Sequence, residues 1–222
     1  MQQIPLAIGG PSLPTFETYL VGPNAQAVQH LRGLVPPAPP VYLWGPAGSG
    51  KTHLLRALAH EVQARGERAG WFDAGDELPW SMASEWSLVV IDHCEALGER
   101  AQQAAFALFV EATGQGVQVA AAGRLPPVDL PLRDDLRTRL GWGHVFALQP
   151  LGEEQTRAAL RREADRRGIF FSDEVMDHLL RRFARDMGSL MGLLDRLDHY
   201  SLARSRAITV PLLRTMLIEE QA

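Results

Sequence analysis

A short glycine-rich stretch sets the framework for this chain. Residues 45–52 read Gly-Pro-Ala-Gly-Ser-Gly-Lys-Thr and fit the pattern G-x-x-x-x-G-K-[ST]. Glycines let such a loop curl until its N–H groups point at phosphate oxygens. Lys51 adds a compact charge for the β- and γ-phosphates, and the Thr52 hydroxyl can ligate Mg²⁺. An apolar run at 41–44 and an apolar-faced helix at 52–59 supply the flanking strand and helix that this phosphate-binding loop requires.

Strand and helix patterns alternate through the rest of the first 150 residues. Further strands are predicted at 69–73, 87–92, 117–122 and 144–148, and further helices at 25–34, 99–114 and 132–140. This alternation predicts a parallel five-stranded α/β sheet with its ligand site at the carboxyl ends of the strands. The loop at 45–52, Asp92 and Gly123 all fall at such ends. Asn24 is expected to cap the first helix.

Asp92 ends the buried run Ser-Leu-Val-Val-Ile-Asp at 87–92. In phosphate-loop proteins a carboxylate at this position holds Mg²⁺, so Thr52 and Asp92 are predicted to share a magnesium ion that binds with ADP or ATP. An ordinary turn residue at the end of a strand is the alternative for Asp92. The next residue is His93, where many related ATPases carry an acid that activates the attacking water.

From Leu151 onward the pattern becomes helical throughout. Helices are predicted at 153–167, 173–185, 186–206 and near 211–218. We therefore predict a nucleotide-binding α/β domain at 15–150 and a small all-helical lid domain at 151–222, which is the plan of AAA+ proteins. The net charge of −4 argues against a large nucleic-acid footprint. Arginine pairs such as Arg161-Arg162 are more typical of solvated helix faces.

Composition also bears on the compartment and on covalent or metal chemistry. Cys94 is the single cysteine, and cysteines and histidines do not occur in pairs at zinc-ligand spacing, so the histidines are interpreted as ordinary residues. We find no apolar run near the roughly 20 residues that span a bilayer. A cytoplasmic protein without membrane contact is the simplest expectation.

Residues 1–14 are rich in proline and glycine and are expected to form an extended tail. Within the tail, Gln3-Ile4-Pro5-Leu6 carries apolar side chains at alternating positions. Such a segment can lie in a groove of a partner with its side chains in pockets. An apolar terminus without a partner is the alternative that the residues alone leave open.

Several stretches together resemble the AAA+ part of DnaA, the family of bacterial replication initiators. They lie at 16–24, 42–55, 90–92, 139–143 and 148–151, and they include Thr-His-Leu-Leu after the phosphate loop and Arg-Leu-Gly-Trp-Gly at 139–143. The resemblance spans nearly the whole chain and ends after the lid. In this it is similar to the short Hda-type relatives, which act with the DNA-loaded sliding clamp to inactivate DnaA.

This resemblance implies roles for particular residues. It implies that Arg139 is an arginine finger offered in trans to ATP on DnaA, with Arg133 and Arg137 as competitors for that role. It implies that the tail docks on the clamp through Gln3, Ile4, Pro5, Leu6 and Ile8. The residues expected to bind the nucleotide are Val21, Gly22, Asn24, Gly45, Pro46, Gly48, Ser49, Gly50, Lys51, Thr52 and Asp92.

Three positions depart from the family pattern. His93 replaces an acid, Gly123 and its neighbours offer no polar sensor after the fourth strand, and Gly188 stands where the initiator has an arginine. We therefore expect a protein that binds nucleotide and turns it over poorly. Whether it is itself an enzyme stays open.

Three functions remain in competition. The first is a regulator that stimulates ATP hydrolysis on DnaA and so negatively regulates replication initiation, with DnaA and the sliding clamp as partners and no direct sequence-specific DNA binding. The second is a replication accessory ATPase similar to helicase loaders, and the third is a self-acting ATPase. The tail favours the first, and a homodimer is left open.

Overall fold

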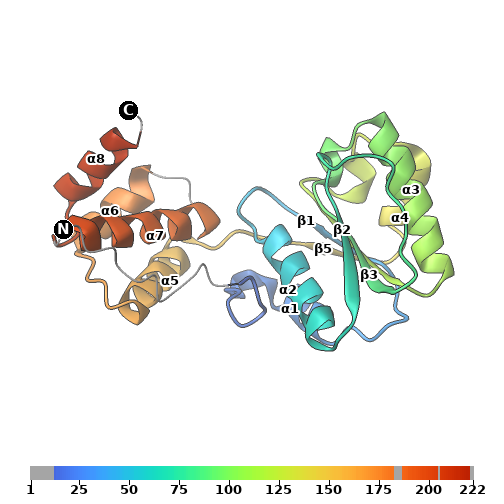
Figure 1. Ribbon diagram of the computed structural model, residues 1–222, viewed down its shortest axis with the longest axis horizontal. Helices are drawn as coiled ribbons and strands as arrows, with labels where there is room; N and C mark the ends of the chain where they lie inside the picture. Colours follow the sequence, from blue (N-terminus) through green and yellow to red (C-terminus); the bar gives the residue numbers. More distant parts are fainter. Residues whose placement is uncertain (1–12, 183–186, 205, 221–222) are drawn as a thin grey trace. The chain divides into compact units, whose positions relative to one another are not determined.

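The structure is a computed structural model that describes residues 13–182, 187–204 and 206–220 (Figure 1). Its contacts divide the chain into two compact units. One unit is Leu13–Pro150, and the other contains the described part of Leu151–Ala222. The expected clamp-binding residues Gln3, Ile4, Pro5, Leu6 and Ile8 lie outside the described residues.

The first unit is built on a five-stranded sheet in the order β2-β3-β4-β1-β5. The strands are β1 (Val41–Trp44), β2 (Arg68–Phe72), β3 (Trp86–Ile91), β4 (Gln118–Gly123) and β5 (His144–Ala147). Every neighbouring pair is parallel, which confirms the predicted α/β sheet. Because β1 lies between β4 and β5, and β3 lies beside β4, the segments that follow β1, β3 and β4 meet at one edge of the sheet.

Helices cover both faces of this sheet, as Figure 1 shows. Side chains of β3 alternate between two cores: Leu88 and Val90 pack with α1 and α2, whereas Val89 and Ile91 pack with α3 and α4. This period of two is the one that strand geometry imposes. The helices are α1 (Ala25–Arg32), α2 (Lys51–Ala64), α3 (Glu99–Gly114) and α4 (Asp134–Leu140), with 3-10 turns η1 (Gly22–Asn24), η2 (Cys94–Ala96) and η3 (Pro127–Asp129).

Asn24 occupies the N-cap position of α1, but its side chain makes no hydrogen bond to the first turn of that helix. The expectation that Asn24 caps α1 through its side chain is therefore wrong. The amide is instead engaged with Tyr19 and with the backbone of Gln149. These contacts compete with capping because one amide group has a limited number of donors and acceptors.

The described part of the second unit is helical, as predicted. It contains α5 (Glu153–Arg166), α6 (Asp173–Arg182), α7 (Met187–Arg204) and α8 (Val210–Glu219). Apolar faces of the four helices form one core, with Leu160, Val175, Leu193 and Leu213 among its buried members. The two units thus bury separate cores.

Arginines on the surface of the second unit are paired with acids of the same unit. Arg161 lies 2.6 Å from Asp173, and the exposed Arg166 lies 2.6 Å from Glu163. These pairs fit the interpretation of the arginine-rich runs as solvated helix faces. Through the described ranges of the chain, no helix combines the length and the apolarity needed to cross a membrane.

Candidate nucleotide-binding site

The glycine-rich loop at 45–50 follows β1 directly and closes tightly against its surroundings. Gly45 has a φ of 153°, and a Cβ added there would lie 2.3 Å from the carbonyl oxygen of Leu148. Gly50 has a φ of 88°, and a Cβ there would lie 2.5 Å from the ring of Tyr19. Any other residue at these positions would clash with backbone or ring atoms and be strained. The loop therefore holds a curled path that glycine alone permits.

The first turn of α2 begins inside this loop. Its N-cap residue, Gly50, has no side chain that could cap the first N–H groups of the helix. Free N–H groups together with the positive end of the helix dipole make a ready site for an anion. The loop and the start of α2 therefore have the donor chemistry that a nucleotide phosphate requires.

Lys51 is 9% exposed, and its ammonium donates hydrogen bonds to the carbonyl oxygens of Gly45 at 2.8 Å and Pro46 at 2.9 Å. Burial lowers the pKa of Lys51; the carboxylates of Glu95 and Asp92 act in the opposite direction, and the cation of Arg124 adds to the lowering. The ammonium thus lies within the phosphate loop, close to two acids and a second cation.

Thr52 and Asp92 are brought together from the two sides of the site. The Thr52 hydroxyl donates to Asp92 Oδ2 at 2.6 Å, and Asp92 is 1% exposed. The other oxygen, Oδ1, accepts the backbone N–H of His93 at 2.9 Å. Hydroxyl and carboxylate oxygens are the ligands that Mg²⁺ prefers in nucleotide sites. The residues present therefore fit the predicted magnesium ion.

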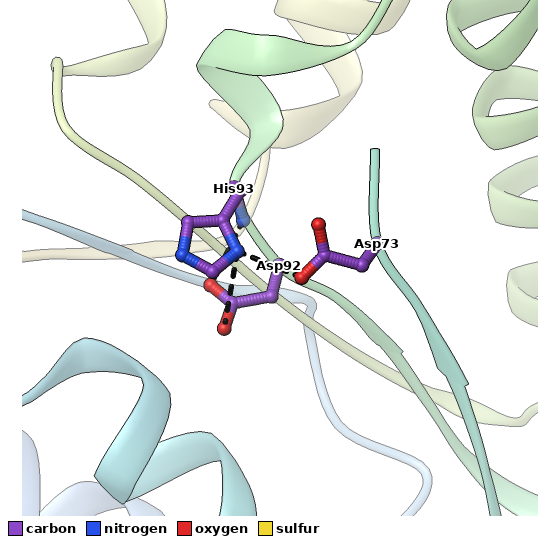
Figure 2. Close-up of side chains that lie close together, drawn as sticks. All are labelled: Asp73, Asp92 and His93. Atoms are coloured by element: carbon purple, nitrogen blue, oxygen red, sulfur yellow. Dashed lines mark hydrogen bonds and ion pairs between the residues drawn. The ribbon is translucent and has the colours of Figure 1, made fainter. Parts of the chain in front are cut away.

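His93 lies beside Asp92 and points toward Asp73, which follows the end of β2 (Figure 2). Its Nδ1 is 2.7 Å from Asp73 Oδ2 and 3.8 Å from Asp92 Oδ2. Burial lowers the pKa of His93, but the hydrogen bond to Asp73 and the charges of Asp92, Asp73 and Glu95 outweigh it and raise that pKa. The imidazole is therefore biased toward its charged form at the position where an acid was expected.

Asp73, Asp92 and His93 bring three ligand atoms within 4.8 Å of one another, so by spacing alone they could hold a metal ion. His93 Nδ1, the ring nitrogen nearest the two acids, already faces Asp73 at 2.7 Å. We therefore interpret Asp73 and His93 as an ion pair beside the magnesium position. Asp73 was not among the predicted site residues, although it ends the run predicted as a strand at 69–73.

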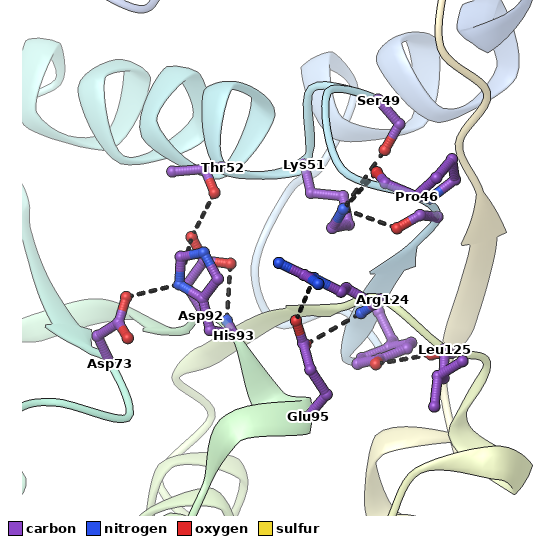
Figure 3. A network of polar contacts seen from close by, with 12 residues as sticks. Pro46, Ser49, Lys51, Thr52, Asp73, Asp92, His93, Glu95, Arg124 and Leu125 are labelled. Carbon is purple, nitrogen blue, oxygen red and sulfur yellow. Dashed lines mark hydrogen bonds and ion pairs between the residues drawn. The ribbon is translucent and has the colours of Figure 1, made fainter. Parts of the chain in front are cut away.

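A second pair crosses the site from η2 to the end of β4 (Figure 3). Glu95 Oε2 accepts the backbone N–H of Arg124 at 3.0 Å, and Glu95 Oε1 forms an ion pair with Arg124 Nε at 3.2 Å. The expectation that the neighbours of Gly123 offer no polar group is therefore wrong, since Arg124 is the next residue. Gly123 itself has no room for a side chain, because a Cβ there would lie 2.2 Å from the Tyr42 hydroxyl.

The expected nucleotide contacts at 21–24 lie in and before η1. Gly22 has a φ of 47°, and Val21 is exposed ahead of the turn. Asn24 is 5% exposed and both donors of its side chain are used: Nδ2 donates to Tyr19 Oη and to the carbonyl of Gln149, and Oδ1 accepts the N–H of Gln149, all at 2.9 Å. In this structure the Asn24 side chain therefore contacts Tyr19 and Gln149 of the protein itself.

Arg139 lies in the last turn of α4, and its guanidinium lies 5.4 Å from the ring centre of Trp142. Trp142 is 65% exposed. Arg133 pairs with Asp135 at 2.7 Å, and Arg137 pairs with Asp134, whereas Arg139 forms no ion pair with any described residue. Of the three arginines that compete for the finger role, Arg139 is the one without an ion pair to an acid in the described part of the chain. Gly188 belongs to the other unit and lies in the first turn of α7.

Four features define an AAA+ P-loop protein: a parallel sheet in this strand order, a phosphate loop after β1, an acid after β3 and a helical unit that follows. Two family models match the chain. Residues 13–70 match the bacterial DnaA ATPase domain, and residues 153–217 match the Hda lid domain, so that together they cover more than half of the sequence. The chain belongs to the DnaA-related replication regulators, as an Hda-like member of that AAA+ family.

Solved structures show the same fold. Domain III of the Thermotoga maritima replication initiation protein DnaA is 20% identical, with 94% of this chain and 98% of that chain covered and a TM-score of 0.75. AMPPCP-bound DnaA from Aquifex aeolicus is 22% identical, with 85% of this chain and 66% of that chain covered and a TM-score of 0.67. A mutant of Thermotoga maritima RuvB is 16% identical, with 92% of this chain and 72% of that chain covered and a TM-score of 0.66.

Proposed function

We propose that this chain is a cytoplasmic regulator that inactivates the replication initiator DnaA. It binds ADP or ATP with Mg²⁺ in the domain at 15–150, which is followed by the lid domain at 151–222. It docks through its tail at 1–14 on the DNA-loaded sliding clamp and supplies Arg139 in trans to ATP held by DnaA. Hydrolysis of that ATP then switches the initiator off and negatively regulates replication initiation.

The observation that carries the proposal is the state of Arg139. Its guanidinium has no carboxylate partner among the described residues and is held near the ring of the exposed Trp142. An arginine that served the local structure would pair with an acid, as Arg133 and Arg137 do. A guanidinium presented at the surface beside an exposed aromatic ring is suited to a charge on another molecule.

The test is single-turnover hydrolysis of labelled ATP preloaded on DnaA, with the clamp loaded on DNA. Arginine fingers contribute roughly 10³–10⁵ to the rate of phosphoryl transfer, so Arg139→Ala is expected to remove stimulation. Its nucleotide binding, clamp binding and thermal stability stay near those of the wild type, because a finger contacts charge that develops in the transition state. Arg139→Lys restores little, since the planar fork is lost.

Arg137→Ala is the matched control, because Arg137 lies on the same helix and pairs locally with Asp134. Its stimulation is expected to stay close to the wild-type value. Full stimulation by Arg139→Ala would exclude the finger role. Fast hydrolysis by this chain without DnaA or clamp would instead favour the self-acting ATPase. A chain that does not bind the clamp at all would favour the replication accessory ATPase similar to helicase loaders.

Nucleotide binding is supported by the loop geometry and by the AMPPCP-bound relative from Aquifex aeolicus. In this chain the residues that would hold the phosphates are the loop at 45–50, Lys51 and Thr52, with Asp92 completing the Mg²⁺ position. The bound ion would neutralise phosphate charge. Lys51→Ala is expected to abolish binding of both ADP and ATP in calorimetric titrations, and unchanged affinity would contradict this assignment.

Clamp docking rests on the sequence pattern of the tail, which resembles the clamp-binding motif of the Hda-type proteins. Replacing Gln3, Leu6 and Ile8 together by alanine is expected to abolish binding to the sliding clamp. The melting temperature should not change, because short tails of this composition contribute little to a folded core. A triple variant that still binds the clamp at wild-type strength would refute the role of the tail.

A further inference from the structure

The two edges of the five-stranded sheet differ in how they are protected. β2 forms one edge, and its pairing with β3 shifts register between Arg68 and Ala69, where Arg68 also pairs with Glu85 at 2.9 Å. Irregular pairing and charged side chains are devices that keep an edge strand from pairing with another segment. β5 forms the other edge, and its sequence His-Val-Phe-Ala includes no lysine, arginine, acid or proline. The edge at β5 is therefore the one that is open to a further strand in the described sheet.

Backbone groups of β5 point toward this open side. The N–H groups of His144 and Leu148 donate to carbonyl oxygens of the segment around β1, at 2.8 Å and 2.6 Å. Because neighbouring residues of a strand alternate in direction, the N–H and C=O groups of Val145 and Ala147 point away from β1. Both residues are exposed, and no strand of the described part of the chain pairs with this side of β5. β5 thus offers two donors and two acceptors in the geometry of a strand.

Helix α1 connects this edge to the start of the described chain. His30 of α1 packs against Phe146 of β5, with 5.0 Å between the ring centres. Arg32, at the end of the same helix, pairs with Glu17 at 3.1 Å, and the described chain begins at Leu13. A helix is about 10–12 Å across with its side chains. Residues that precede Leu13 therefore start about one helix width from β5.

The segment that precedes Leu13 lies outside the described residues, but its sequence has the pattern of an edge strand. Ile4, Leu6 and Ile8 occupy alternate positions, so in an extended segment their side chains share one face and their backbone groups share one direction. Pro5 has no N–H, so its position suits the side that faces away from a partner strand. Extended, the five residues from position 8 to position 13 span up to about 17 Å, which exceeds the width of a helix.

We propose that residues 3–8 of the tail dock on β5 of the same chain as a sixth strand, with the backbone groups of Ile4, Leu6 and Ile8 facing Val145 and Ala147. In strand addition of this kind, main-chain hydrogen bonds supply the affinity and side chains at alternate positions supply the specificity. While docked, the tail covers the open edge and is withheld from the sliding clamp. The effect on the clamp rests on the function proposed above, whereas the docking itself does not.

Hydrogen exchange of the full chain, followed at the amides of β5, tests the docking. Leu6→Pro removes an N–H that the docked tail donates, so exchange at Val145 and Ala147 should become faster by about 10-fold or more. Ala7→Pro is the matched control, because Ala7 faces away from β5 in the docked strand, as Pro5 does; exchange should change by less than about 2-fold. Amides that exchange equally fast in the wild type and in Leu6→Pro would overturn the proposal.

Dilution identifies the occupant of the edge. Docking within one chain does not depend on concentration, so protection of the β5 amides should stay constant when the protein is diluted. Sedimentation at the same concentrations gives the oligomeric state. If protection falls on dilution together with a dimer, a second copy covers the edge and docking within the chain is refuted.

Adding the sliding clamp tests the competition. Excess clamp should speed exchange at Val145 and Ala147 to the rate found in Leu6→Pro, because the tail leaves β5. Val145→Lys places a charge on the edge and should raise the affinity for the clamp by roughly 3-fold or more, since a larger fraction of the tail is free to bind. Val110→Lys is the matched control: Val110 is 41% exposed on α3, compared with 39% for Val145. Its affinity should stay within about 2-fold of the wild type.

The outcomes separate this inference from the proposed role of the tail. If the clamp neither binds nor changes the exchange, while Leu6→Pro still exposes the β5 amides, the docking stands and the clamp role is refuted. If the clamp binds the wild type and both lysine variants alike, and the β5 amides exchange freely throughout, the clamp role stands and the docking is refuted.

Discussion

Replacing Asn24 by alanine should reveal a hydrogen-bonded connection between the phosphate loop and the end of β5. The side chain of Asn24 joins Tyr19 Oη to both backbone groups of Gln149, and Tyr19 Oη donates in turn to the carbonyl of Ser49 at 3.2 Å. Ser49 belongs to the phosphate loop. Gln149 immediately precedes Pro150, where the first compact unit ends.

The expected cost follows from these contacts. Asn24→Ala removes three hydrogen bonds from a residue that is 5% exposed. Each is worth about 0.5–1.5 kcal/mol net, and water can reach the exposed Gln149 in part, so we expect a loss of about 2–3 kcal/mol. For a unit of this size that corresponds to a fall in melting temperature of roughly 5–10 °C.

Tryptophan fluorescence in a urea titration is the suitable assay, because all five tryptophans lie between residues 44 and 142 and report on the first unit alone. The midpoint should fall while the slope with urea stays constant. Tyr19→Phe should cost about 1 kcal/mol, and the double variant should cost less than the sum, because the two side chains share a hydrogen bond. A loss below about 0.5 kcal/mol for Asn24→Ala, or strict additivity, would refute the connection.

Two further changes test the packing of each unit. Hydrogen bonds from Arg166 and Arg167 outweigh burial and lower the pKa of Glu163 to about 2. Glu163→Gln should therefore destabilise the helical unit by about 1–2 kcal/mol at neutral pH. In circular-dichroism melts, the difference in stability between the variant and the wild type should shrink as the pH falls from about 4.5 toward 2. A difference independent of pH would contradict this. Gly123→Ala should cost about 1–3 kcal/mol through its clash with Tyr42, and Tyr42→Phe should relieve much of that cost; simple addition of the two effects would refute the clash.

Features that depend on neighbouring residues could be predicted from the sequence. The bounds of β1 and of α3 follow from short apolar runs and helical periodicity, and the phosphate loop follows from eight consecutive residues. The meeting of Thr52 with Asp92 followed from the rule that the carboxyl ends of parallel strands share one edge. Each of these inferences needs only local pattern and the topology of a parallel sheet.

The pairing of Arg124 with Glu95 and the contacts of Asn24 could not be predicted, because they depend on register and on distant partners. Tyr42 pairs with Ala121 across β1 and β4, which carries its hydroxyl forward to Gly123 and leaves Arg124 as the polar residue. Asn24 finds its hydrogen-bond partner 125 residues further along the chain, in the backbone N–H and C=O of Gln149. A local preference for helix capping cannot predict a contact with so distant a residue. The position of Asn24 at the N-cap of α1 was therefore predicted, but the hydrogen bonds of its side chain were not.

Lys51 gives this protein a natural chemical reporter. It is the only lysine in the sequence, and its amine lies within the phosphate loop, 9% exposed and bonded to two carbonyl oxygens. An amine-directed reagent therefore finds one side-chain target, and that target is the group that would bind the phosphates. The extent of acylation at Lys51, read by mass spectrometry, would follow ligand occupancy in the unaltered protein, in purified samples and in whole-cell extracts alike.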